Sequence, residues 1–263
     1  MKPNETFYPE NATRFGRSRG GNDLVEHQWG NHEKSILFLT GFTEEDSPIS
    51  DLLLRWERDL FEAERYGGIL GDFDLKTLKN KCKIRMIPIL NPDSYKINQN
   101  GLSKNFEKTE NSLKSKDSYP IKPEIQKKTF IVDLNRNFNA NWIKMRQKDP
   151  QNHRFGAFPE SEPEVAFLTA RLKEDLPKSA VILRQGEKAL FHPSEATEKE
   201  LREAVFLGHY ASLSVTLASD TDGTPLQCLT DRGVKVIEAH LPPSTPNQYP
   251  KWRNFLTMCT ALT

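Results

Sequence analysis

The stretch VDLNRNFNANW at residues 132–142 decides the fold assignment. It places Arg136 between two asparagines, with apolar residues on either side. A guanidinium is planar, permanently charged and able to donate two parallel hydrogen bonds, a geometry that suits a carboxylate. In a half-buried position, as the apolar neighbours predict, Arg136 is therefore a candidate carboxylate-binding residue. The alternative is that Arg136 forms a structural ion pair within the fold.

Two other stretches lie on either side of this one. PILNPDSY (88–95) predicts a strand followed by an Asn-Pro-Asp turn. FPESEPEVAFL (158–168) predicts the start of a helix over 161–177, with Ser161 as N-cap, Pro163 in the first turn and Glu164 completing a capping box. Each stretch alone is weak evidence for a fold, but the three together, in this order along the chain, are strong evidence.

Around these stretches, strands alternate with helices. Short apolar runs rich in β-branched residues predict buried strands, and longer amphipathic segments predict helices. An alternating pattern of this kind indicates an α/β fold whose sheet is covered on both faces. The expected strands are 35–40, 83–90, 180–184, 213–218 and 234–241, and the further expected helices are 48–67, 194–211 and 249–262.

Composition limits the classes of function. The chain has 263 residues and a net charge of +1, which gives no reason to expect a nucleic-acid or acidic-membrane partner. No apolar run approaches the roughly 18 residues of a membrane span. The N-terminus lacks the apolar core of a secretory signal, so a cytoplasmic protein is expected. The isolated cysteines Cys82, Cys228 and Cys259 are expected to be buried thiols, which favours a reducing compartment.

One segment departs from the pattern. Residues 96–128 hold eight lysines and four acidic residues and few aliphatic ones. We expect a single domain over 1–263 with a basic, mobile insertion at about 96–128. Loops of this length are often functional, and a solvated insertion without a role is the alternative.

Taken together, these stretches resemble the zinc carboxypeptidase family and, within it, the small bacterial murein tripeptide amidase branch. The resemblance covers nearly the whole chain. It implies a single-domain α/β fold with a mixed, twisted sheet of about eight strands between helices. The stretches that carry it are RFGRSRGG (14–21), NPDSY (91–95), VDLNRNF (132–138), SEPE (161–164) and EAHLPP (238–243).

The resemblance breaks at the metal site. The family binds zinc through a His and a Glu, spaced His-x-x-Glu, in the loop after a strand, and through a second His at the end of a later strand. The aligned positions here are Thr43 and Asp46 in GFTEED (41–46), and Arg184. A neutral hydroxyl is a poor zinc ligand, and a guanidinium offers only donors. We therefore expect no zinc, and we expect Arg184 to pair with Asp46 and with Glu238 in the space of the metal.

Other site residues follow from the same resemblance. The catalytic glutamate of the family lies near the Pro-Pro pair, which makes Glu238 and His240 the candidates; alternate strand residues face the same side, so both can point into one cleft. Asn135 and Arg136 match the residues that hold the substrate carboxylate. The mobile tyrosine of the family has no clear match in SDTDGTPLQCL (219–229). A relocated metal site built from residues 44–46 and His240 is a rival, less favoured than a solvated acidic loop.

The predicted function is that of a carboxypeptidase-like protein without zinc or peptidase activity. Its cleft is expected to bind a peptide or peptidoglycan fragment with a free carboxylate, or a protein partner, and no cofactor is expected. The first alternative is an active metallo-carboxypeptidase or amidase acting on peptidoglycan peptides with an atypical metal site, in which zinc activates the attacking water. The second is a regulatory or structural interaction protein with a filled cleft.

Overall fold

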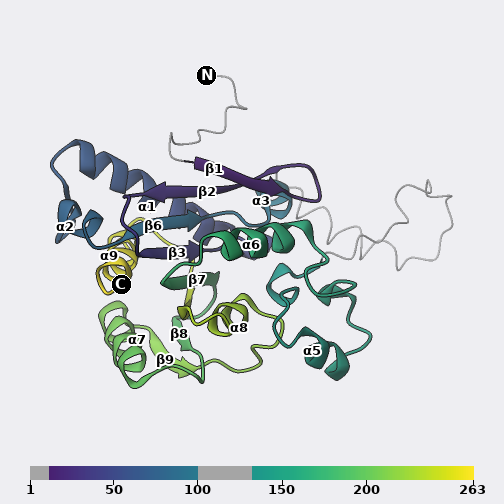
Figure 1. The fold of residues 1–263 in the computed structure, drawn as a ribbon. Coiled ribbons are helices and arrows are strands. Elements are labelled where there is room, and N and C mark those ends of the chain that lie inside the picture. The colour runs from purple at the N-terminus through teal and green to yellow at the C-terminus, as the bar shows by residue number, and fades with distance from the viewer. Residues whose placement is uncertain (1–11, 100–131) are drawn as a thin grey trace.

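The centre of the molecule is a mixed eight-stranded sheet (Figure 1), seen in a computed structural model that describes residues 12–99 and 132–263. The strand order is β1-β2-β6-β3-β7-β10-β8-β9. The mixed sheet predicted from the sequence is thus confirmed. Its strands are β1 (Ala12–Arg17), β2 (Asp23–Trp29), β3 (Ser35–Leu39), β6 (Lys83–Ile87), β7 (Ser179–Gln185), β8 (Ala189–His192), β9 (Ser214–Leu217) and β10 (Lys235–Leu241), while β4 (Ile69–Leu70) and β5 (Phe73–Asp74) form a separate small hairpin.

Four neighbouring strands in the middle of the sheet, β6, β3, β7 and β10, run parallel to one another. β2 and β8 join this group on its two sides in antiparallel pairing. Parallel strands end at the same edge of a sheet, and ligands of open α/β sheets bind beyond the carboxyl ends of their strands. The carboxyl ends of β3, β7 and β10 therefore define where a site is to be sought.

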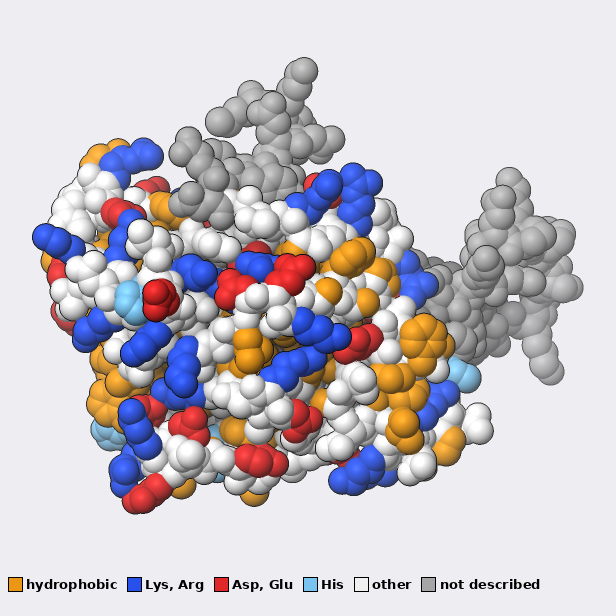
Figure 2. Space-filling view, viewed as in Figure 1, with side chains coloured by type: hydrophobic (Ala, Val, Ile, Leu, Met, Phe, Trp, Pro, Cys, Tyr) orange, Lys and Arg blue, Asp and Glu red, His pale blue; other side chains and the backbone are white. Residues whose placement is uncertain are grey.

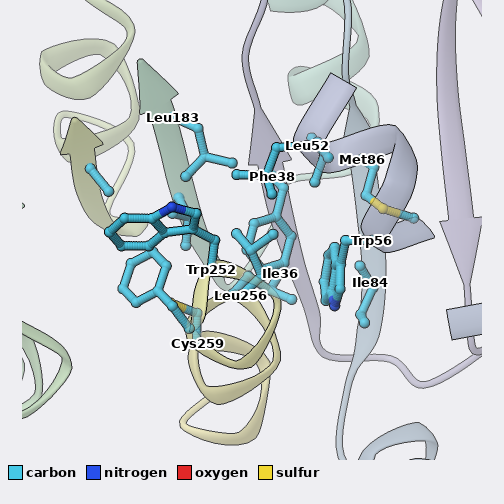
Figure 3. Close-up of a cluster of buried hydrophobic side chains, with 14 of the residues drawn as sticks. Ile36, Phe38, Leu52, Trp56, Ile84, Met86, Leu183, Trp252, Leu256 and Cys259 are labelled. Atoms are coloured by element: carbon cyan, nitrogen blue, oxygen red, sulfur yellow. The ribbon is translucent and has the colours of Figure 1, made fainter. Parts of the chain in front are cut away.

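Helices cover both faces of the sheet. On one face, α1, α2, α7 and α9 enclose a core that contains Phe38, Trp56 and Trp252 (Figure 3). On the other face, α6 and α8 pass in front of the sheet in Figure 1 and pack on Leu37, Ile182 and their neighbours. The helices are α1 (Ser47–Arg65), α2 (Leu75–Lys79), α3 (Pro92–Gln99), α5 (Trp142–Lys148), α6 (Pro163–Glu174), α7 (Glu198–Ala211), α8 (Pro225–Thr230) and α9 (Tyr249–Ala261), with 3-10 turns η1 (Glu44–Asp46), η3 (Leu134–Arg136) and η4 (His153–Phe155).

The strands expected from apolar runs are all present. β1 and β2 were missed because charged and polar residues interrupt them, and β8 was missed because it is only four residues long. The expected start of α6 is wrong. Its N-cap is Glu162, because the Ser161 hydroxyl is engaged elsewhere, accepting a hydrogen bond from Asn137 Nδ2. The predicted insertion begins inside α3, to which residues 96–99 belong, and its remainder lies outside the described residues.

A buried ion pair joins β2 to β6. The side chains of Glu26 and Arg85 are both fully buried, and Arg85 Nε and Nη2 donate to the two Glu26 oxygens over 2.9 and 2.8 Å. Arg171 of α6 donates to the same carboxylate over 3.2 Å. Burial raises the pKa of Glu26, but its bonds to Arg85 and the charges of both arginines outweigh burial, so the pKa is lower than usual. This cluster fixes α6 against the sheet.

Breaking this pair is expected to destabilise the protein strongly. Arg85→Met leaves Glu26 buried without its main partner, which costs about 3–5 kcal/mol of unfolding free energy. Urea denaturation followed by circular dichroism measures the loss. Arg14→Met is the matched control, because Arg14 pairs with Asp23 on the surface and exposed pairs contribute about 1 kcal/mol or less. Equal losses in the two variants would contradict the structural role of the pair.

Glu164 in the first turn of α6 is a buried carboxyl with an incomplete set of partners. Its Oε1 accepts from the Arg19 backbone N–H, while Oε2 is buried and has no hydrogen-bond partner among the described residues. Burial raises the pKa of Glu164 despite that hydrogen bond, and the charges of Asp93 and Glu162 add to the rise. Folding therefore disfavours the ionised form of this group.

Glu164→Gln is expected to stabilise the protein increasingly as the pH rises. Below the ordinary glutamate pKa, Glu164 is protonated in both the folded and the unfolded protein and does not change the free energy of unfolding. Above that pKa the unfolded chain ionises first, so the wild type loses stability as the pH rises, until the pH passes the raised pKa of the folded protein. Melting temperatures of variant and wild type between pH 4 and 8 test this. Glu187→Gln, at an exposed site, is the control, and a difference independent of pH would contradict the expectation.

Candidate functional site

The fold brings five of the predicted site residues to the carboxyl ends of three parallel strands. Thr43 and Asp46 follow β3, Arg184 is near the end of β7, and Glu238 and His240 are near the end of β10. His240 pairs in register with Arg184, and Glu238 with Ile182. Because side chains alternate between the faces of a strand, Arg184, Glu238 and His240 lie on the same face, the one covered by α6 and α8.

Asp46 is buried, with 1% of its side chain exposed, and both carboxylate oxygens accept hydrogen bonds. Arg184 Nε lies 3.1 Å from each oxygen, and the Gln185 N–H donates to Oδ1 over 3.1 Å. The N–H groups of Phe42 and Thr43 donate to Oδ2 over 3.2 Å. The predicted pairing of Arg184 with Asp46 is therefore present, and it joins the loop after β3 to the end of β7.

Arg184 keeps its charge in this setting. Burial alone would lower the pKa of the guanidinium, but the charges of Asp46 and Glu238, with that of Asp133, outweigh burial and raise it. The guanidinium also lies 5.2 Å from the centre of the Phe42 ring, within the range of a cation–π contact. Asp133, whose charge has the smallest effect of the three, caps the turn η3.

Glu238 and His240 contact each other. His240 Nε2 lies 2.6 Å from Glu238 Oε1, and the imidazole packs on Phe191 of β8 with 4.6 Å between ring centres. About a third of the His240 side chain is exposed (30%), against 15% of Glu238. The predicted pairing of Arg184 with Glu238 is seen only as a favourable charge effect on the pKa of Arg184, while the ion pair of Arg184 is with Asp46.

The residues at these strand ends do not fit a zinc ion. Zinc needs lone pairs from thiolate, imidazole or carboxylate, and those of Asp46 are engaged by Arg184 and three backbone N–H groups. Arg184 adds only donors and a positive charge. For the rival site, Asp46 is buried and bonded to Arg184 whereas Glu45 is exposed, so these two carboxylates do not face the same point. In residues 12–99 and 132–263, no three His, Cys, Asp or Glu side chains are grouped so as to hold a metal ion.

Arg136 is held by a loop that the sequence did not single out for this role. Its Nη1 donates to the carbonyl oxygens of Asp220 and Asp222 over 2.6 and 3.3 Å, and its Nη2 lies 3.0 Å from Asp220 Oδ2. The structural ion pair considered as an alternative is thus present. Asn135, next to it, has a buried Oδ1 without a hydrogen-bond partner among the described residues.

The 219–224 loop is attached to the Arg136 segment by its backbone as well. Phe138 N–H donates to Gly223 O, and Gly223 N–H donates to Ala140 O. Asp222 is nearly buried and lies 2.8 Å from Lys148 Nζ of α5. The signal in the sequence was the acidic run Asp-Thr-Asp-Gly at 220–223, whose charge is complementary to the lysines within 142–148. From the sequence we considered this segment only for a match to the mobile tyrosine of the family.

One hollow of the surface adjoins this site, and another cavity lies away from it. An open hollow of about 710 Å³ adjoins it, lined by Gln185–Ala189, Ser214, Pro242 and Pro243. A more enclosed cavity of about 250 Å³ lies at the opposite end of β7 and β10, near Ser179, Lys235 and Cys259, away from Arg184. Over the face that carries α6 and α8, acidic and basic side chains are interspersed (Figure 2). No helix within the described ranges has the length and apolar character needed to cross a membrane.

The family model for zinc carboxypeptidases matches residues 64–226, more than half of the chain. The chain belongs to the zinc carboxypeptidase family. No curated protein matches it in sequence.

Solved structures agree with this family at the level of the fold. The murein-tripeptide amidase MpaA from Escherichia coli O157 aligns with a TM-score of 0.59 and 18% identity, over 98% of this chain and 93% of that one. Bovine thrombin-activatable fibrinolysis inhibitor, solved in complex with tick carboxypeptidase inhibitor, aligns with a TM-score of 0.65 and 15% identity, over 95% of this chain and 88% of that one. Carboxypeptidase A from Helicoverpa armigera aligns with a TM-score of 0.64 and 12% identity, over 96% of this chain and 68% of that one.

Removing the Arg184 guanidinium is expected to destabilise the protein. Arg184→Met leaves the buried Asp46 carboxylate without its counter-charge, at a cost of about 3–5 kcal/mol of unfolding free energy. Urea denaturation measures the change. Arg202→Met is the control, because Arg202 pairs with Glu198 on the exposed surface of α7. A loss below about 1 kcal/mol for Arg184→Met, the value of surface pairs, would show that the pair is not structural.

Proposed function

We propose that this chain is a carboxypeptidase-like binding protein that neither holds zinc nor hydrolyses peptides. The observation that carries the proposal is the Arg184–Asp46 pair, which occupies two positions that the family resemblance assigns to metal ligands. A guanidinium there supplies positive charge but cannot coordinate a metal ion or its bound water, because it has N–H donors only and no free lone pair. The missing metal-activated nucleophile is what family hydrolysis requires.

The ligand we propose is a peptide or peptidoglycan fragment with a free carboxylate, bound by Asn135 and Arg136. Half-buried arginine favours carboxylates, and 26% of the Arg136 side chain is exposed. The fold is shared with a murein-tripeptide amidase and with carboxypeptidases, whose names refer to peptides. A cytoplasmic location is part of the proposal and is supported by three free, buried cysteines.

Metal analysis together with an activity assay tests the absence of zinc. Purified wild type is expected to contain no stoichiometric zinc and to leave a murein tripeptide intact, with or without added zinc. The variant Thr43→His, Asp46→Glu, Arg184→His provides the matched comparison, since it places zinc-binding side chains at the three positions and is expected to gain zinc. Stoichiometric zinc in the wild type, with hydrolysis that a chelator abolishes, would refute the proposal and favour the active metallopeptidase.

Calorimetric titration of the wild type with the murein tripeptide tests the binding part separately. Saturable binding without hydrolysis is the expected result. A zinc-free protein that binds neither this fragment nor peptides with a free carboxylate would favour the interaction protein with a filled cleft.

A further inference from the structure

The polar contacts of the Arg136 guanidinium within the described part of the chain go to the 219–224 loop, and they are of two kinds. Nη1 donates to backbone carbonyl oxygens, whereas Nη2 faces the carboxylate of Asp220 at 3.0 Å. The first kind fixes the loop to the arginine. The second places a carboxylate of the protein itself on the guanidinium edge that an incoming carboxylate would use.

The Asp220 carboxylate is placed so that it can be displaced. Its side chain is 59% exposed, so releasing it from Arg136 returns it to water at little cost. Lys148 Nζ, 3.8 Å from Asp220 Oδ1, offers the released carboxylate a second partner. Asp222 differs: it is nearly buried, and although burial raises its pKa, Lys148 and Lys144 outweigh burial and lower it. Asp222 thus anchors the loop while Asp220 can move.

Backbone strain gathers in the same place. Asp220 has a φ of +52°, and two further non-glycine residues with positive φ, Asn141 at +53° and Glu160 at +59°, flank the Arg136 segment. Glu160 N–H donates to Asn137 O, and Asn141 follows Ala140, which accepts from Gly223. Such conformations cost free energy and concentrate at ligand-binding and switching segments.

We propose that Asp220 is an internal counter-ion of Arg136 that a ligand carboxylate replaces, so that Asp220 sets the affinity for ligands with a free carboxylate. The proposal rests on the proposed function in assuming a carboxylate ligand at Arg136. Binding exchanges one carboxylate for another at Nη2 and leaves the Nη1 bonds to the loop backbone in place. The binding free energy therefore contains the difference between the Arg136–ligand and Arg136–Asp220 ion pairs. An uncharged residue at 220 removes the second ion pair and is expected to tighten binding.

Calorimetry with the murein tripeptide as the free acid and as its C-terminal amide tests this. Asp220→Asn keeps the shape and tolerates positive φ, and is expected to tighten binding of the free acid about threefold to tenfold and to leave the amide unchanged. Asp220→Gly, which adopts positive φ freely, should give the same result. Asp149→Asn, an equal charge change at the exposed C-cap residue that follows α5, is the control and should have little effect.

The outcomes separate the two proposals. If wild type and both Asp220 variants bind the free acid equally, Asp220 is no competitor and this inference is wrong, while the proposed function stands. If none of the proteins binds either form, both are wrong. Thermal melts of the variants within a few degrees of wild type show that a changed affinity does not arise from unfolding.

Discussion

The need to satisfy one buried carboxylate, that of Asp46, organises the functional end of this molecule. A charged group out of water has to be paired and hydrogen-bonded, or it becomes strongly destabilising. Arg184 Nε and three backbone N–H groups meet that need, and they come from the end of β7 and from the loop after β3. The geometry of both segments is thereby set by one group, and the positions of Glu238 and His240 follow through the pairing of β10 with β7.

The same arrangement explains why a family fold can persist without a metal ion under the function proposed for it. A metal ion and a guanidinium both compensate the negative charge at the strand ends, so the fold keeps its electrostatic balance with either. They differ chemically, because only the metal accepts lone pairs from water and lowers the pKa of that water. Structural compensation and hydrolytic chemistry are thus separable in this architecture, and Arg184 provides the first.

Sequence reasoning worked where neighbours in the chain decide the outcome and where the family resemblance supplied an alignment. Apolar runs gave the central strands, and the family resemblance gave the pairing of Arg184 with Asp46 across 138 residues. It failed where a distant partner intervened. The cap of α6 moved to Glu162 because Asn137, 24 residues away from Ser161, engages that hydroxyl. β2 was missed because its charged residue Glu26 is buried only in the presence of Arg85.

The sequence by itself determined the fold class, through its hydrophobic periodicity. Through the family resemblance it also identified Thr43, Asp46 and Arg184 at the aligned ligand positions. Only the tertiary structure decided which partners the other charged groups take. Arg136 meets Asp220 across 84 residues, and Glu164 loses its contact with water only when α6 packs on the sheet. Burial and pairing depend on the folded distance between groups, which no single stretch of the chain encodes.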